Sequence, residues 1–258
     1  MSSLNEGLKK ITILEVLIII LALIGIFIIF QFAGYSINYD WIGVFVILYF
    51  IYRLRIFGDG FRHDLNNIFS KITPKSLLLI VLVNVFFSYG MLYLSIFALD
   101  NIPGLDSFIV AFFAPLMPVN SLMDVGALFS TIVISPIYEE LLFRGIFLNR
   151  LCLVVPLSFA IAISSILFGS LHGFGGIISA VVFGVCMCII YLKTQNILTC
   201  ILAHFINNLL AELLYHFDSG NLIFTNDIFI VLFSILAIVS LYLIVVSIRQ
   251  EWKHITKR

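Results

Sequence analysis

Apolar residues occupy most of the chain, in long runs separated by short polar or charged stretches. A helix needs about 20 apolar residues to cross the hydrocarbon core of a bilayer. Reading the chain in these units predicts eight membrane-spanning helices, at residues 11–33, 41–57, 77–99, 126–148, 154–171, 175–192, 197–215 and 228–248. An even number of spans places both chain ends on the same side of the membrane.

Two stretches outside these spans are assigned differently. The run Phe108 to Val119 is apolar, but it is short and contains Pro115 and Pro118. Proline interrupts a helix, so we expect this run to be a re-entrant or interfacial segment on the outer side. The long loop over residues 58–75 is predicted to be an amphipathic segment at the inner membrane surface.

The positions of the basic residues test this arrangement. With eight spans, all fourteen lysines and arginines fall on one side of the membrane. The loops on the opposite side carry acids only: Asp40, Asp100, Asp106, Asp124, Asp218 and Asp227. Basic residues concentrate in cytoplasmic loops, so both termini are predicted to be cytoplasmic.

Composition agrees with a membrane protein. Hydrophobic residues make up 62% of the chain and charged residues 11%, with a mean hydropathy of +1.18. Soluble domains carry about 25% charged residues. We therefore predict an all-α polytopic membrane protein, with about eight transmembrane helices around a polar intramembrane cavity. It is expected to be one integral membrane domain, 1–258, made of N-terminal spans (1–107), a catalytic core (108–215) and a last span with a basic cytoplasmic tail (216–258).

Charged side chains inside a predicted span are the first candidates for function. Glu139, Glu140 and Arg144 lie in the fourth span, where charge is costly and usually serves a purpose. On a helix Glu140 and Arg144 share a face and can form an ion pair, whereas Glu139 points about 100° away. We interpret Glu140 and Arg144 as structural and Glu139 as functional. The alternative is a buried ion network without chemistry.

Three more polar side chains stand out in other spans. His172 follows Phe168 by four residues, and His204 precedes Asn208 by four, so the members of each pair share a helical face. At about 1.5 Å per residue, Glu139 and these polar groups all lie inside the bilayer, within about 11 Å of one another in depth. Three helices can therefore converge on one cavity. The plainer alternatives are an interfacial histidine and a His/Asn hydrogen bond between helices.

One glutamate, two histidines and one asparagine suit hydrolysis by activated water. A carboxylate moved out of water is a stronger base, and imidazole and amide groups can donate hydrogen bonds to an oxyanion. Zinc also accepts two histidines and a glutamate, here Glu139, His172 and His204. The sequence leaves metal-free and metal-assisted hydrolysis open.

The three motifs together carry a family resemblance. EExxxR (Glu139, Glu140 and Arg144), FxxxH (Phe168 and His172) and HxxxN (His204 and Asn208) follow in order on separate spans. Over residues 110–215 the chain resembles the CAAX-processing and bacteriocin-processing (CPBP) family of intramembrane proteases, also called the Abi or type II CAAX endopeptidase family. The resemblance implies an all-helical peptidase whose site opens from the cytoplasmic half of the membrane.

The resemblance also implies roles for the motif residues. Glu139 is expected to activate water with His172 beside it, and Glu140 and Arg144 are expected to be the supporting pair. His204 and Asn208 are expected on the oxyanion side, or alternatively as metal ligands. We therefore expect an endopeptidase in a bacterial cell membrane.

Its partners are expected to be the lipid bilayer and a membrane-associated peptide or protein substrate, with no nucleic acid. A non-catalytic bacteriocin-immunity or peptide-binding protein is the main alternative. A small transporter that relays protons through the carboxylates is a weaker one. The substrate, the cleavage position and the oligomeric state are left open.

Overall fold

The computed structural model describes residues 4–35, 40–55, 58–105, 107, 125–218 and 226–256. Every regular element in these ranges is helical. Six helices are long and apolar enough to cross a membrane, or seven if one bent helix pair is counted as a span. This finding confirms the prediction of an all-α polytopic membrane protein.

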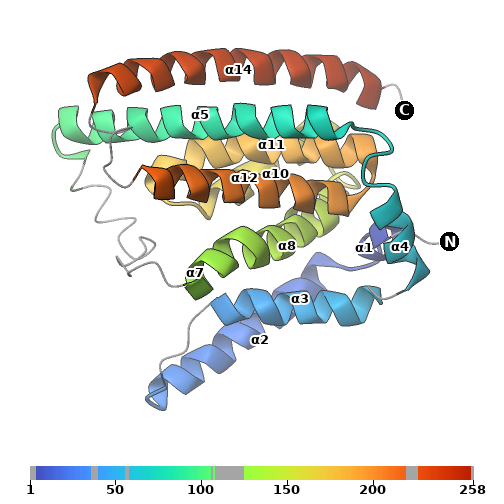
Figure 1. Ribbon diagram of the computed structural model, residues 1–258. Helices are drawn as coiled ribbons and strands as arrows, with labels where there is room; N and C mark the ends of the chain where they lie inside the picture. Colours follow the sequence, from blue (N-terminus) through green and yellow to red (C-terminus); the bar gives the residue numbers. More distant parts are fainter. Residues whose placement is uncertain are drawn as a thin grey trace.

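Five helices lie side by side in the larger part of the bundle (Figure 1). They are α5 (Pro74–Asn101), α10 (Leu157–Ser170), α11 (Ile177–Thr194), α12 (Ile197–Phe217) and α14 (Asp227–Ile255). Close packing between them uses glycine: a Cβ on Gly184 of α11 would lie 3.1 Å from Ser165 Cβ of α10. Small residues allow such close approach of helices in membranes. This contact fixes the helix that leads to His172 against α11.

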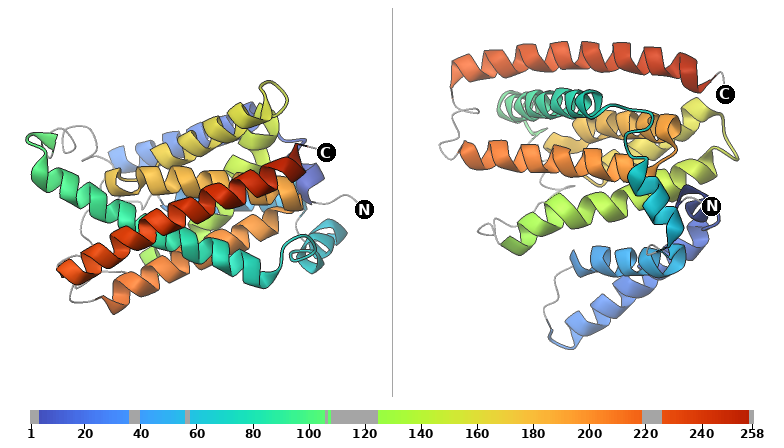
Figure 2. Two further views of the ribbon diagram at one scale, coloured as in Figure 1. Left: turned by 90° about the horizontal axis from the view of Figure 1, so that it is seen from above. Right: turned by 45° about the vertical axis from the view of Figure 1, so that its right-hand side comes forward.

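The smaller part of the bundle contains α2 (Ile13–Phe32) and α3 (Asp40–Leu54), on the far side of the helix that carries the glutamates (Figure 1). Most side chains of α2 are exposed, including large apolar ones such as Leu21 and Ile29. Apolar side chains at the surface of a membrane-spanning helix are expected to contact lipid tails. The N-terminal helix α1 (Leu4–Leu8) and the C-terminal end of α14 lie at the same end of the bundle in both views of Figure 2.

Each of the eight predicted spans contains a helix, but two of these helices are short. The helix α3 has 15 residues and α10 has 14. At about 1.5 Å per residue, neither reaches the roughly 30 Å of a bilayer core. The count of eight spans is therefore approximate. The predicted interfacial segment Phe108–Val119 lies outside the described residues, and the 58–75 loop contains the helix α4 (Asp59–Asn66).

The fourth predicted span is one continuous helical segment over residues 125–151. It consists of α7 (Val125–Phe129), η2 (Ser130–Ile134), α8 (Ser135–Glu140), η3 (Leu141–Leu148) and α9 (Asn149–Leu151). Both η2 and η3 are π-helical, and such wider turns occur frequently at functional sites. The wider turn of η2 precedes Pro136, which lacks the N–H that an α-helix would use. The two glutamates therefore sit between two π-helical stretches.

Polar contacts hold the last part of this segment. Asn149 Nδ2 donates to Gly145 O in η3 at 2.7 Å and lies 2.7 Å from the hydroxyl oxygen of Tyr191 in α11. The Tyr191 hydroxyl in turn donates to Asn5 Oδ1 of α1. Leu8 of α1 is fully buried beside Gly145. The N-terminal helix, η3 and α11 are thus joined at one end of the bundle.

Candidate active site

The predicted ion pair is the most deeply buried part of the site. Arg144 Nη1 donates to Glu140 Oε1 at 3.0 Å, and neither side chain is exposed. Arg144 Nη2 also donates to Gly184 O of α11 at 3.2 Å. The predicted pairing of Glu140 with Arg144 is confirmed. The contact with Gly184 links this pair to α11, which sequence reasoning did not predict.

His204 of α12 connects the two glutamates. Its Nδ1 lies 2.8 Å from Glu140 Oε1, and its Nε2 lies 3.9 Å from Glu139 Oε2. A carboxylate only accepts, so Nδ1 of His204 is the donor to Glu140. The second distance is too long for a direct hydrogen bond, but one water can bond to both atoms. Glu139, His204, Glu140 and Arg144 therefore form one chain of polar groups.

Aromatic rings enclose this chain. The Phe168 ring centroid lies 4.8 Å from that of His172, as its spacing predicts, and 4.4 Å from the guanidinium carbon of Arg144. A cation over an aromatic face in a desolvated place is stabilised by about 2 kcal/mol. Phe183 of α11 lies 4.9 Å from the His204 ring, edge to face. No motif pointed to Phe183, because an apolar residue in an apolar helix carries no sequence signal of its own.

His172 lies at the edge of the site, just after the end of α10. Its Nδ1 is 3.0 Å from Phe168 O, which only accepts, so this nitrogen carries a proton and donates. In a neutral ring Nε2 is then an acceptor. Among the ion-pair contacts of the described residues, only His204 comes within 4.0 Å of Glu139. The structure therefore places His204, and not His172, in contact distance of the expected base.

Asn208 lies one turn after His204 on α12. Its Nδ2 donates to Thr131 O of η2 at 2.9 Å, and its Oδ1 accepts from Asn207 Nδ2 at 3.3 Å. The amide group is therefore held against the π-helical stretch that precedes the glutamates. Thr131 is a contact that the HxxxN motif did not predict.

Two polar atoms of the site have no hydrogen-bond partner within the described residues. They are Glu140 Oε2 and Arg144 Nε, and both are buried. A buried polar atom without a partner costs about 1–3 kcal/mol. The side chain of Glu139 is 16% exposed, so the site is accessible at Glu139 and closed at Glu140.

The part of the chain that the structure describes contains no group of three His, Cys, Asp or Glu side chains that could hold a metal ion. Glu139, His172 and His204, the ligand set considered from the sequence, are thus not gathered as such a group in this structure, and the choice between metal-free and metal-assisted hydrolysis stays a prediction. The four cysteines, Cys152, Cys186, Cys188 and Cys200, are free, and all except Cys152 are buried.

The part of the chain that carries the three motifs is similar to a known protein family. A family model described as type II CAAX prenyl endopeptidase Rce1-like matches residues 121–210. The matched region contains all three motifs, and the match confirms the resemblance to the CPBP family. It supports an intramembrane endopeptidase of the CAAX type in general. No curated protein and no solved structure matches the chain.

Proposed function

Because residues 121–210 match the CAAX-protease family, we propose that the protein is an intramembrane endopeptidase that uses Glu139 to activate water. The substrate is a membrane-associated peptide or protein. The observation that carries this proposal is the chain of contacts from Arg144 through Glu140 and His204 to Glu139. These contacts hold the His204 imidazole in a fixed orientation beside the Glu139 carboxylate, at a distance of 3.9 Å that one water can bridge by bonding to both atoms.

Charge balance supports a proton shared by Glu139 and His204. The pair of Glu140 and Arg144 is neutral in total, and a buried site without net charge avoids a large desolvation cost. One proton on either Glu139 or His204 leaves the four groups neutral. The form with an ionised Glu139 and a protonated His204 combines a base with a hydrogen-bond donor.

In this form each residue has a defined task. Glu139 takes a proton from the bridging water as the water oxygen attacks the peptide carbonyl carbon. The N–H of His204 donates to the carbonyl oxygen as negative charge develops on it. Glu139 then returns its proton to the amine that leaves when the C–N bond breaks. Glu140 keeps the ring in place through Nδ1, as a carboxylate orients the histidine in a catalytic triad.

Asn208 and His172 are proposed to flank the substrate. The Asn208 amide lies one turn from His204 on the same face of α12, where it can align the peptide backbone. His172 presents Nε2 as an acceptor for a substrate N–H, because its Nδ1 is occupied by Phe168 O. Cytoplasmic termini and a bacterial cell membrane remain our expectations for this enzyme.

The experiment is a comparison of purified wild type with Glu139→Gln on a library of membrane-tethered peptides. We expect cleavage by wild type and at least about a hundredfold loss in the variant, the usual contribution of a general base. The matched control is Glu212→Gln, a carboxylate of α12 two turns after His204 that is not part of the ion-pair contacts of Glu139, Glu140, Arg144 and His204 among the described residues. Equal cleavage by Glu139→Gln and wild type would remove the peptidase proposal. Peptide binding without cleavage by wild type would favour the immunity or peptide-binding alternative.

A further inference from the structure

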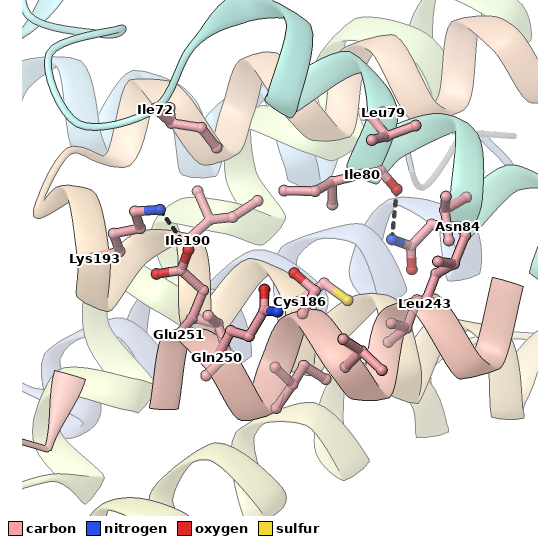
Figure 3. A pocket seen from close by; sticks show the side chains of 16 residues that line it. Ile72, Leu79, Ile80, Asn84, Cys186, Ile190, Lys193, Leu243, Gln250 and Glu251 are labelled. Carbon is pink, nitrogen blue, oxygen red and sulfur yellow. Dashed lines mark hydrogen bonds and ion pairs between the residues drawn. The ribbon is translucent and has the colours of Figure 1, made fainter. Parts of the chain in front are cut away.

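A cavity lies between α5, α11 and α14 (Figure 3), and neither Glu139 nor Glu140 lines it. Its volume is about 270 Å³. The walls are mainly aliphatic side chains, contributed by Leu79, Ile80, Ile189, Ile190, Leu243 and Ile244. Hydrocarbon is the ligand chemistry that such walls bind. None of the site motifs contributes a residue to this cavity.

A neighbouring hollow of about 490 Å³ shares Ile72, Leu79 and Lys193 with the walls of this cavity. Lys71, Thr73, Ser76 and Lys193 line this hollow. Thr73 Oγ1 accepts from Ser76 N at 3.1 Å and so caps the first turn of α5. A helix N-terminus with nearby lysines attracts anions.

The two lysines of the hollow differ in their partners. Lys193 Nζ forms a 2.6 Å ion pair with Glu251, which Figure 3 shows at the rim. Lys71 has no acidic partner among the described residues. The hollow therefore offers one uncompensated positive charge beside the start of α5.

A buried amide marks the wall of the cavity. Asn84 is 1% exposed, and its Nδ2 donates to Ile80 O at 2.8 Å, as the dashed line in Figure 3 shows. Its Oδ1 has no partner within the described residues. Asn84 lies about 15 Å along α5 from Pro74. An acceptor at this depth can be satisfied by a hydrogen-bond donor partway along a bound chain.

We propose that this cavity binds a long-chain anionic amphiphile. The acidic head lies beside Lys71 and the first turn of α5, and the hydrocarbon chain lies between α5, α11 and α14. Asn84 Oδ1 accepts a hydrogen bond from a hydroxyl group on the chain. A free fatty acid and an acidic membrane lipid share this chemistry. The site is independent of the proposed peptidase activity.

Binding is measured by displacement of a fluorescent fatty acid from the purified full chain in non-ionic detergent. We expect stearate to displace the probe at one molecule per chain, and stearyl alcohol to be about tenfold weaker because it lacks the charge-assisted contact. Inorganic phosphate is expected not to displace it. Displacement by phosphatidylglycerol as well as stearate would identify a membrane lipid as the source, and displacement by stearate alone a free fatty acid. Equal potency of acid and alcohol, or no saturable binding, would overturn the proposal.

Variants locate the site. Lys71→Glu is expected to weaken stearate binding about tenfold, whereas Lys10→Glu, an exposed lysine near α1, is expected to leave it unchanged. Ser247→Trp, a surface position at the rim, is expected to block binding. Wild-type binding by Ser247→Trp, or equal effects of the two lysine variants, would place the ligand elsewhere.

Asn84→Leu tests the role of the buried amide in the cavity wall. Wild type is expected to prefer a mid-chain hydroxy fatty acid to stearate about fivefold, the value of one hydrogen bond. The variant is expected to lose this preference while it still binds stearate. Thermal unfolding of each variant confirms that it is folded, so that lost binding is not mistaken for a lost fold. An unchanged preference in Asn84→Leu would remove Asn84 from the site.

Discussion

Replacing Arg144 by methionine tests the most buried interaction of the site. The substitution removes the 3.0 Å ion pair with Glu140, the hydrogen bond to Gly184 O and the position over the Phe168 ring. Glu140 stays fully buried. Among the described residues, His204 is then its one remaining ion-pair partner. Removing one partner of a buried ion pair costs about 3–5 kcal/mol. We expect the free energy of unfolding to fall by that amount.

The double variant Glu140→Gln/Arg144→Met separates the ion pair from packing. A buried pair replaced by neutral groups of similar volume is often close to neutral in stability. We therefore expect each single variant to be much less stable than the double variant, with a coupling free energy of about 2–4 kcal/mol. Activity is expected to be lost in the two variants that lack the Glu140 carboxylate, because Glu140 no longer orients His204.

The assay is reversible unfolding of the purified chain in mixed micelles, followed by circular dichroism. The control is Arg53→Met, because Arg53 forms a 3.0 Å ion pair with Glu15 that is partly exposed. Exposed pairs contribute little to stability, so we expect this variant to unfold much as the wild type does. If the two single variants at Glu140 and Arg144 were additive in the double variant, the buried pair would carry no coupling and the reasoning would be refuted.

Three further results are expected. His204→Gln should lower cleavage at least about a hundredfold in the peptide assay with little loss of thermal stability, and cleavage close to wild type would contradict the role of its Nε2. Asn149→Ala should lower the free energy of unfolding by about 1–3 kcal/mol, because Gly145 O and the Tyr191 hydroxyl lose a partner; no change in chemical denaturation would contradict this. Chelation with phenanthroline should leave cleavage unchanged, and a loss that one added ion restores would establish a metal-assisted reaction.

Local spacing predicted the local contacts of the site well. The pairs of Glu140 with Arg144 and of Phe168 with His172 each lie four residues apart within a short helical stretch, and both are present. The bond from His204 to Glu140 joins residues 64 positions apart. It depends on how α12 packs against α8, which hydropathy does not encode.

The predicted spans and the observed helices differ in their bounds for physical reasons. Hydropathy reports where the chain prefers lipid, not where a helix begins. In α10 the helix begins after Pro156, so the apolar run from residue 154 is longer than the helix. The π-helical stretches on both sides of Glu139 and Glu140 alter the angular spacing of side chains, which a regular 3.6-residue period does not describe.

The two halves of the helical segment 125–151 are held very differently. Seven of the eight residues of η3 are buried, whereas α7 and η2 contain no buried residue. Glu139 lies between these two halves. The residues that follow it in η3 are buried, and those of α7 and η2 that precede it are not. Val125 and Phe129 are both exposed, so we expect the N-terminal end of the segment to contact lipid tails while the buried ion pair stays still.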